Sequence, residues 1–467
     1  MLPLHPLSWF AMPTRRLPLS PSGALPLTAA GSGGSAPADH HDVVIVGAGL
    51  AGLAAAEELA ARGYKIAVLE AAGHIGGRTV TDNATFAPHG VDLGAQFFHQ
   101  AEQNPLVPIA RAMGYSSSPN VPSPYVYGPY DDASGGFSLD TSLAAAFNRH
   151  DRIMNQAMAE AGAAIAAGDM ADLSVATLAR TLGPPDAGSG LSWRFLCDVM
   201  EGRSAEDCSV LDIYNTTTRG HDNRLNLGGM GNFVSERFRD IPVSLGTRVE
   251  RIDWSGSGVR LHTGRGAMQA RATIVTVPVG VLSGGALRFT PALPAAYEAA
   301  FHQLPMAVLD KAFLQFEHDV FAGLDANTPI FPASDDPEGP LIIARSYGAN
   351  LCTVFVGADQ AIALERQGER ALLEFALDTV AHVAGTRARK AYNGRGLATR
   401  WAHDPNAHGS YTAAVVGGVA ARDQLAIPIA DRIHFAGEAV SVASHSTVWG
   451  AYESGLVAAE RVALALA

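Results

Sequence analysis

The sequence has few of the features that would place it in several large protein classes. Its 467 residues include only three cysteines, Cys197, Cys208 and Cys352, and none stands in a CxxC pair, so no zinc site or redox dithiol is indicated. It has no HExxH pattern either, and we expect no bound metal. No uninterrupted apolar run reaches the ~18 residues that a transmembrane helix needs, so we expect no membrane partner. Positive charge is also scarce: the net charge is −12, which argues against nucleic acid as a partner.

The chain is instead that of a globular protein with enough residues for two or three domains, since 48% of it is hydrophobic. Residues 1–41 differ from the rest and are rich in proline, serine and glycine. Arg15-Arg16 precede a mildly apolar stretch, and Ala36-Pro37-Ala38 resembles a cleavage site, as in a twin-arginine export signal. Prolines interrupt that stretch, so a disordered tail is an equal alternative. We therefore expect a cytoplasmic protein, or a periplasmic one if the segment is a signal.

A glycine-rich turn near the N-terminus carries the clearest functional signal. A short apolar run leads into Gly47-Ala48-Gly49-Leu50-Ala51-Gly52, a helix-like segment follows, and a second apolar run ends at Glu70. Gly47 permits a tight turn, Gly49 lets the main chain approach a pyrophosphate, and Gly52 lets the helix pack close to the strand. The helix N-terminus favours phosphate, and Glu70 can accept hydrogen bonds from ribose hydroxyls. The pattern predicts a Rossmann-like βαβ unit that binds a dinucleotide.

The remaining sequence alternates between helical and strand patterns. We expect helices within Asp140–Leu182, Ser192–Met200 and Arg366–Val383, and a meander of strands between Val249 and Thr276. From Lys311 onward the strands, among them Ala398–Trp401, predict an antiparallel sheet. The chain ends in a strand, a glycine turn at Gly437 and a helix, so it starts and ends in the nucleotide-binding layer. We assign 42–120, 225–283 and 396–467 to a discontinuous dinucleotide-binding domain and 121–224 and 284–395 to a substrate-binding domain.

Further motifs occur in a fixed order after the glycine turn. They are Gly76-Gly77-Arg78, Asp92-Leu93-Gly94-Ala95, Gly228-Gly229-Met230-Gly231, the strand ending Val277-Pro278, and Phe435-Ala436-Gly437-Glu438 with Gly450-Ala451 and Ser454-Gly455. From about residue 42 to the end, this series resembles the flavin-containing amine oxidase family, which includes monoamine, polyamine and L-amino-acid oxidases and the lysine-specific histone demethylase. The resemblance implies an α/β fold. It would have a Rossmann-like FAD-binding domain of the glutathione-reductase type, interleaved with an α+β substrate domain that contains an antiparallel sheet.

Within this family the polyamine oxidase and histone demethylase branch is the most similar. The segments Asp310–Phe316 and Thr399–Tyr411 resemble that branch, and Gly94–His99 resembles the animal polyamine oxidases. We find no helical insert long enough for the demethylase's coiled-coil arm and no DNA-associated domain before residue 42, so we expect no chromatin role.

The resemblance implies FAD as cofactor and assigns residues to it. The diphosphate would lie on the glycine turn near Arg78, the adenine near the main chain of Val249, and the ribityl chain near Glu438. The residues expected to bind FAD are Gly47, Gly49, Leu50, Ala51, Gly52, Glu70, Ala71, Gly77, Arg78, Gly94, Ala95, Gln96, Val249, Trp401, Gly437, Glu438, Thr447 and Val448. Ser410 stands where monoamine oxidases carry a flavin-linking cysteine, so we expect non-covalent FAD.

The resemblance also implies catalytic residues. Lys311 would hold a water near flavin N5, which requires burial that lowers its pKa or keeps a bound water. Tyr411 and Trp401 would supply aromatic surface at the flavin face, and Thr447 would stand opposite Tyr411 in an incomplete aromatic cage. His99 would orient the substrate amine. The alternative interpretations are structural: an ordinary lysine at a sheet edge for Lys311, a core position for Trp401 and a structural histidine for His99.

The expected activity is FAD-dependent oxidation of a polyamine or similar secondary amine by hydride transfer to flavin N5. Oxygen would be the acceptor, and H₂O₂ with an aldehyde or imine would be the products. An L-amino-acid or aromatic monoamine oxidase is the first alternative; it would need an arginine clamp, for which Arg194, Arg219 and Arg345 are open candidates. A non-catalytic flavin-binding partner protein and a carotenoid or porphyrinogen oxidase are the others. Substrate identity and oligomeric state stay open.

Overall fold

The computed structural model describes residues 40–121, 124–130, 136–184, 186–217, 222–333 and 340–467. The expected tail therefore lies outside the described residues, except that the first strand already begins at His40. All described residues belong to one compact unit. Within them, no helix is both long and apolar enough to cross a bilayer.

The first sheet has eight strands in the order β12-β9-β10-β11-β1-β2-β8, with β20 also paired to β11. The strands are β1 (His40–Val46), β2 (Ile66–Leu69), β8 (Val243–Ser244), β9 (Val249–Asp253), β10 (Val259–Thr263), β11 (Gly266–Val275), β12 (Arg288–Thr290) and β20 (Ile433–Phe435). β1 runs parallel to both β2 and β11, whereas β10 is antiparallel to β9 and β11. The β-branched run Val43–Val46 is buried on both faces, as a central parallel strand requires.

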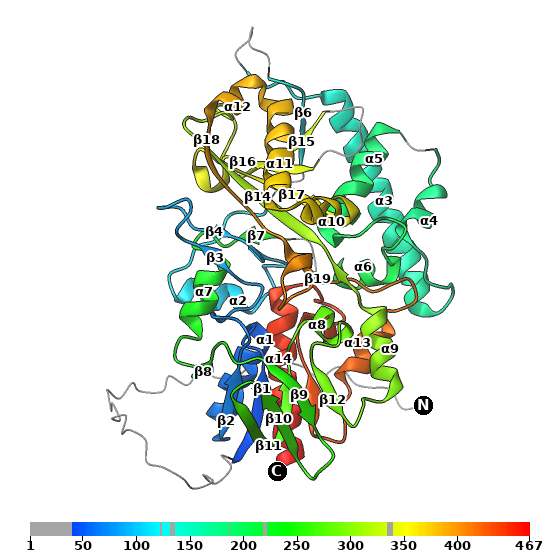
Figure 1. The fold of residues 1–467 in the computed structure, drawn as a ribbon. Coiled ribbons are helices and arrows are strands. Elements are labelled where there is room, and N and C mark those ends of the chain that lie inside the picture. The colour runs from blue at the N-terminus through cyan, green and yellow to red at the C-terminus, as the bar shows by residue number, and fades with distance from the viewer. Residues whose placement is uncertain (1–39, 122–123, 131–135, 185, 218–221, 334–339) are drawn as a thin grey trace. The chain divides into compact units, whose positions relative to one another are not determined.

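Helices cover this sheet, and α1 (Leu50–Ala61) and α14 (Val448–Leu466) lie side by side against it (Figure 1). A Cβ atom on Gly455 of α14 would lie 2.2 Å from the carbonyl oxygen of Ala51, so the two helices approach closely because Gly455 has no side chain. The other helices of this region are α2 (Leu106–Ala112), α7 (Met230–Arg237), α8 (Val279–Ser283), α9 (Ala295–Gln303), α13 (Ala420–Ala426) and the 3₁₀ helix Glu438–Val440.

The second sheet has six strands in the order β18-β14-β17-β16-β15-β6. They are β6 (Tyr125–Tyr127), β14 (Leu309–Phe316), β15 (Thr328–Pro332), β16 (Leu341–Ala344), β17 (Leu351–Gly357) and β18 (Tyr392–Ala398). The pairs β14–β17, β14–β18, β16–β17 and β15–β16 are antiparallel, as expected, and β6 joins β15 in parallel. α10 (Ala358–Gln367), α11 (Glu369–Ala384) and α12 (Thr386–Ala391) accompany this sheet, and a 3₁₀ turn covers Ser346–Gly348.

A helical group and three short strand pairs complete the fold. The helices are α3 (Thr141–Ala167), α4 (Val175–Arg180), α5 (Ala187–Arg194), a π-helix (Phe195–Glu201) and α6 (Val210–Thr217). The short pairs are β3 (Thr81–Asp82) with β4 (Val91–Asp92), β5 (Phe97–Phe98) with β7 (Arg224–Leu225), and β13 (Met306–Ala307) with β19 (Tyr411–Thr412).

Several expected elements differ in their limits, for local physical reasons. The helix expected over Arg366–Val383 is two helices, because Gly368 adopts a φ of +101° between α10 and α11. The strand expected at Ala398–Trp401 ends at Ala398, and a 3₁₀ helix spans Trp401–His403. The Ser192–Met200 helix is α-helical only to Arg194 and then continues as the π-helix.

The expected domain limits remain a prediction, although two strands bear on them. β12, from the range assigned to the substrate-binding domain, pairs with β9 of the first sheet. β18 runs through the expected limit at residue 396 and pairs with β14.

Candidate active site

The glycine turn between β1 and α1 has the geometry that the sequence motif requires. Gly47 has a φ of +103°, and a Cβ on Gly52 would lie 2.0 Å from the carbonyl oxygen of Gly47. A Cβ on Gly49, by contrast, would meet nothing within 4 Å, so this position opens onto free space. Gly49 is also the cap of α1, and no side chain caps the helix there. The first turn of α1, with Leu50 and Ala51, therefore offers main-chain N–H groups toward an open position.

Glu70 lies directly beside this turn, at the end of β2. Its carboxylate accepts hydrogen bonds from the main-chain N–H groups of Ala48 and Ala72, both at 2.7 Å. Ala71 lies between Glu70 and Ala72 in the chain. A carboxylate has about four lone-pair sites, so two remain for other donors. Thr247 N donates to Glu70 O, which brings the start of β9 at Val249 to this edge of the sheet.

Arg78 and Glu438 meet although 360 positions separate them in the sequence. Arg78 Nη1 lies 2.9 Å from Glu438 Oε1 and donates to Ser410 O at 3.0 Å. Glu438 is buried and also accepts from Thr412 Oγ1 at 2.6 Å and from Ser446 N at 3.1 Å. Burial would raise the pKa of Glu438, but the Arg78 charge and these hydrogen bonds hold it below its ordinary value. The arginine is thus in a partly buried ion pair, not a surface one.

The glycines around this pair leave room on one side. A Cβ on Gly437 would meet nothing within 4 Å, whereas one on Gly94 would lie 1.8 Å from Arg78 O. Ala95 N also donates to Arg78 O at 3.1 Å, and Gly77 lies against the glycine turn, where its Cβ would be 3.3 Å from Gly49 Cα. The Gly77–Arg78 and Gly94–Ala95 segments are therefore bound to each other next to the open position at Gly49.

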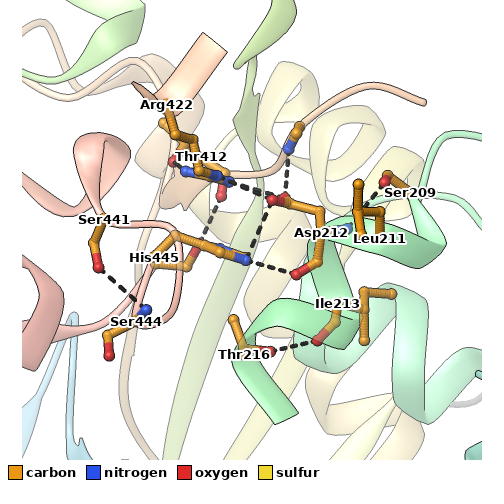
Figure 2. Close-up of polar contacts among 12 residues, drawn as sticks. Ser209, Leu211, Asp212, Ile213, Thr216, Thr412, Arg422, Ser441, Ser444 and His445 are labelled. Carbon is orange, nitrogen blue, oxygen red and sulfur yellow. Dashed lines mark hydrogen bonds and ion pairs between the residues drawn. The ribbon is translucent and has the colours of Figure 1, made fainter. Parts of the chain in front are cut away.

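A second buried ion pair supports the loop that leads into α14 (Figure 2). Arg422 Nε and Nη2 lie 2.9 and 2.8 Å from the two carboxylate oxygens of Asp212, and both side chains are almost fully buried. Arg422 Nη1 donates to Thr412 Oγ1 at 3.0 Å, which links this pair to Glu438. His445 Nε2 lies 3.0 Å from the Asp212 main-chain oxygen, so α6 is joined to the turn that precedes Thr447.

Lys311 is buried in β14, and its ammonium group reaches the predicted flavin segment. Nζ donates to the main-chain oxygens of Asp92 (2.9 Å) and Gly94 (2.6 Å) and to Gln96 Oε1 (2.5 Å). Burial lowers its pKa to about 7, and the Asp92 carboxylate opposes that shift. Three acceptors match the three N–H bonds of the charged form, so Lys311 binds this segment with its whole ammonium group, whereas burial favours the neutral amine. Its role in holding a water near flavin N5 remains a prediction.

The side chain of Asp92 fixes the start of this segment through hydrogen bonds. Its carboxylate is fully buried and accepts from Thr81 Oγ1 at 2.6 Å and from Met230 N at 2.9 Å, at the N-terminus of α7. The positive end of α7 therefore faces a negative charge, which stabilises both. Burial nevertheless raises the pKa of Asp92.

The two candidate aromatic residues occupy different surroundings. Trp401 is half-buried, and its Nε1 donates to Leu93 O at 3.3 Å, so its ring packs on the Leu93–Gly94 main chain. Tyr411 Oη donates to Met200 O at 3.0 Å, at the end of the π-helix. Burial, with the Glu201 charge as the next cause, raises the pKa of Tyr411, which keeps the phenol neutral.

The hydroxyl of Thr447 already has local partners. It accepts from Gly450 N at 3.0 Å as the N-cap of α14 and donates to Ser444 O at 2.7 Å. Val448 is the first residue of that helix and is buried. The structural role of Thr447 is therefore helix capping, and its place in an aromatic cage remains a prediction.

His99 is held in one orientation by Asn223. Its Nδ1 lies 2.8 Å from Asn223 Oδ1, and an amide oxygen accepts, so the proton is assigned to Nδ1. Burial lowers the pKa of His99, so the ring is neutral and Nε2 carries a free lone pair. A neutral imidazole with this tautomer can accept a hydrogen bond from an ammonium group.

Glu201 was not singled out by the sequence motifs, and it lies beside Tyr411. It follows Met200, whose carbonyl oxygen accepts a hydrogen bond from Tyr411 Oη. It precedes Gly202, where a Cβ would lie 3.1 Å from Tyr411 Oη. Burial raises the pKa of Glu201 to about 8, with the Asp212 charge adding to it and Arg422 opposing it. Within the described part of the chain, no hydrogen bond to its carboxyl group is found. The sequence carries no signal for it, because the π-helix at whose end Glu201 lies is seen only in the structure.

Two of the three arginines considered for the clamp of the alternative activity lie beside carboxylates. Arg345 is paired with Asp319 at 2.8 Å, and Arg194 lies 3.8 Å from Asp198. Arg219, the third candidate, lies outside the described residues.

The residues present fit a flavin dinucleotide. An uncapped helix N-terminus at Gly49, a carboxylate with spare lone pairs at Glu70, and a second open glycine at Gly437 line one edge of the first sheet. The described cysteines are buried, and Ser410 Oγ is bonded to the main chain of Leu309, so no thiol stands at the expected linkage position. The roles of the individual residues stay predictions.

Comparison with known proteins gives one consistent result. The family model described as "Flavin containing amine oxidoreductase" matches residues 50–463. Polyamine oxidase 2 of Arabidopsis thaliana is 26% identical over 438 residues, covering 90% of this chain and 87% of that protein. A lysine-specific histone demethylase 1 homolog of Oryza sativa is 28% identical over 88% of this chain, and the chain spans 51% of its length.

Solved structures agree on the fold. Putrescine oxidase bound to putrescine superposes with a TM-score of 0.74 at 20% identity, covering 92% of this chain and 100% of that chain. Cyclohexylamine oxidase from Brevibacterium oxydans gives a TM-score of 0.71 at 22% identity, covering 92% and 99%. The predicted fold class is therefore confirmed. The chain belongs to the flavin-containing amine oxidoreductase family, as an amine oxidase whose FAD is bound without a covalent link.

Proposed function

We propose that the protein oxidises a polyamine or a similar secondary amine with oxygen as acceptor. The observation that carries this proposal is Glu201, a carboxyl group beside Tyr411 that has no hydrogen-bond donor among the described residues. A polyamine has one nitrogen to be oxidised and at least one more that is charged. The carboxylate is suited to the charged nitrogen, which a monoamine lacks and an amino acid would replace with a repelling carboxylate.

The other site residues bind and orient in this scheme. His99 accepts a hydrogen bond from substrate nitrogen at Nε2, and Tyr411, kept neutral, offers its ring to the amine. Lys311 holds or releases a proton near neutral pH at Nζ, close to the segment Gly94–Gln96. Bound FAD supplies the two-electron acceptor for amine oxidation, and the protein excludes water and positions the C–N bond.

Binding of the amine also changes the charge of the site. Glu201 has a pKa of about 8 without a ligand, so much of it is protonated at pH 7. An ammonium group next to it favours the carboxylate form, so substrate binding is accompanied by release of a proton. Affinity for a diamine should therefore increase between pH 7 and 8.

The test is anaerobic mixing of the yellow protein with spermidine, spermine, acetylated polyamines, putrescine, tyramine and L-amino acids. Loss of the flavin absorbance band on adding a polyamine supports the proposal. Loss only with amino acids or aromatic amines assigns the protein to the alternative activity. If no amine reduces the flavin, the proposal fails and the non-catalytic alternative gains support.

The role of Glu201 is tested in the same assay. Glu201→Gln should weaken spermidine binding about tenfold or more, as expected for loss of a charge-assisted hydrogen bond, with little effect on tyramine. Glu206→Gln, on an exposed carboxylate of the following loop, is the matched control and should behave as wild type. Equal losses for both amines would remove Glu201 from substrate selection.

A further inference from the structure

Two buried carboxyl groups meet behind the strand that carries Lys311. Asp310 lies in β14 and Glu365 in α10, and both are fully buried. They lie side by side, because consecutive main-chain N–H groups of one turn bind both: Trp401 N donates to Asp310, and Ala402 N and His403 N donate to Glu365. Each side chain shifts the pKa of the other in the way that a shared hydrogen bond would. Ionised carboxylates have acceptor oxygens and no donor, so a hydrogen bond between two of them requires a proton.

The contacts of each oxygen show where that proton lies. Asp310 Oδ1 accepts from Thr399 Oγ1 at 2.8 Å and from Trp401 N at 3.1 Å, whereas Oδ2 is buried with no donor among the described residues. Glu365 Oε1 accepts from Ala402 N at 2.9 Å, and Oε2 accepts from His403 N at 3.0 Å. Glu365 therefore has the partners of a carboxylate, and Asp310 Oδ2 is the oxygen left to carry a hydrogen.

The electrostatics of the pair agree with this geometry. Burial, and then Glu365, raise the pKa of Asp310 to about 8. Burial would also raise the pKa of Glu365, but hydrogen bonds from Asp310, from His403 and from the main chain lower it. At neutral pH the pair therefore carries one negative charge and one proton.

Other ionisable groups surround the pair. The half-exposed His403 has Nδ1 2.5 Å from Glu365 Oε2, and Arg400 Nη2 donates to the Glu365 main-chain oxygen at 2.9 Å. Glu369 accepts from Ala398 N in β18, and Lys311, next to Asp310, directs its Nζ to Asp92, Gly94 and Gln96 instead.

We propose that Asp310 and Glu365 share one proton, and that this protonated pair positions the Trp401–His403 turn against the strand of Lys311. All three main-chain N–H groups of that turn donate to the pair. Thr399 Oγ1 continues the connection, because it donates to Asp310 and accepts from Lys311 N at 2.8 Å. The pair is thus a positioning device for Trp401 and Lys311, and it does not depend on which amine is oxidised.

Loss of the proton would place two negative charges in contact in a buried site. The Asp310–Glu365 hydrogen bond would then break, and the turn that carries Trp401 would lose its fixed position. Because the native state releases this proton near pH 8, we expect an alkaline transition in the holoenzyme around that pH.

The test uses Asp310→Asn, whose amide can donate permanently to Glu365 while its oxygen keeps the bonds from Thr399 and Trp401. The infrared spectra are recorded in the Glu201→Gln background, because Glu201 also has a pKa of about 8 and would add a band of its own. In that background, the holoenzyme with Asp310 intact should contain the C=O stretch of a protonated carboxylic acid that disappears with a midpoint near pH 8. Asp310→Asn should lack this band and its titration. Asp359→Asn, on an exposed carboxylate of the same helix α10, should retain both.

The stability of the protein gives a second readout with a defined sign. The pKa of Asp310 is raised from 3.8 to about 8 by folding. Its protonated form therefore stabilises the folded state fully below about pH 4, and this stabilisation is lost progressively as the pH rises to about 8. The thermal midpoint of the wild type should therefore fall relative to Asp310→Asn between pH 4 and 8 and run parallel above pH 8.

If Asp310→Asn does not fold, Glu365→Gln replaces it: the glutamine amide then donates to an ionised Asp310, and the alkaline transition should again disappear. The proposal is overturned if the acid band and the transition near pH 8 persist in either variant. None of these readouts requires turnover, so they are independent of the proposed substrate.

Discussion

Removing Arg422 should be among the most damaging single changes in this protein, because it isolates a buried carboxylate. Asp212 is 2% exposed, and both its oxygens are paired with Arg422, which is 0% exposed (Figure 2). Breaking a buried ion pair on one side costs about 3–5 kcal/mol. Arg422→Met also removes the hydrogen bonds to Thr412 Oγ1 and Ala439 O, so we expect the upper part of that range and reduced FAD content.

A double-mutant cycle separates the pair from its surroundings. Asp212→Leu should cost a similar amount, because it leaves Arg422 unpaired and removes the acceptor for Ala414 N. The double variant with Arg422→Met should cost only about 1–3 kcal/mol, mainly for the unpaired N–H. Arg271→Met, which breaks an exposed pair with Asp42, is the control and should cost less than about 1 kcal/mol.

The assay is urea unfolding of each variant in saturating FAD, followed by far-ultraviolet circular dichroism. Burial would raise the pKa of Asp212, but the Arg422 charge, His445 and hydrogen bonds hold it well below its ordinary value. The pair therefore stabilises the protein above pH 4, and this stabilisation is lost as the pH falls. Additive costs in the double variant, or single losses below about 1 kcal/mol, would refute the reasoning.

Three further predictions concern the site. Lys311→Met should keep FAD bound but slow flavin reduction or reoxidation. The pH profile of its kcat/KM should also lack the ionisation near pH 7 that the wild type shows. Unchanged rates of both half-reactions would remove Lys311 from the mechanism. His99→Ala should reduce polyamine turnover about tenfold or more while the FAD absorbance per protein stays constant, and lost FAD would instead indicate a structural residue. Gly52→Ala should abolish FAD binding, since its Cβ would lie 2.0 Å from Gly47 O, whereas Gly264→Ala, with open space around it, should leave the yellow holoprotein intact.

Local sequence was enough to predict the nucleotide-binding edge. The turn at Gly47–Gly52 and the carboxylate at Glu70 depend on a few neighbouring residues, so their spacing carries the geometry. Arg78 and Glu438 were each assigned by family resemblance, but nothing in the sequence showed that they contact each other across 360 positions.

Buried polar groups in the second half of the site could not be predicted in this way. Asp310 precedes Lys311 in a strand pattern, and Glu365 lies on a helix whose buried positions read as an ordinary apolar face. Their contact arises only when α10 packs beside β14, and no spacing rule connects residues on a helix and a strand that far apart. Asp212 and Arg422, separated by 210 positions, were missed for the same reason.

Element limits failed where backbone conformation overrode side-chain pattern. The positive φ of Gly368 splits one expected helix into two, and the expected strand at Trp401 is replaced by a 3₁₀ turn whose main-chain N–H groups bind Asp310 and Glu365. An apolar sequence pattern indicates which of these positions are buried. It does not show the buried acceptors that determine the backbone conformation there.

The burial of the three cysteines has a consequence for the durability of the protein if, as proposed, oxygen is its acceptor and peroxide its product. Peroxide oxidises the thiolate form of cysteine, and burial raises the pKa of Cys352, while Cys208 and burial raise that of Cys197. These sulfurs are thus kept as unreactive thiols away from solvent. Met200, which is 40% exposed and whose carbonyl binds Tyr411, is by contrast an accessible sulfur beside the proposed site. We therefore expect oxidative modification during turnover to accumulate as methionine sulfoxide, which reductases can reverse, and not as irreversible oxidation of cysteine.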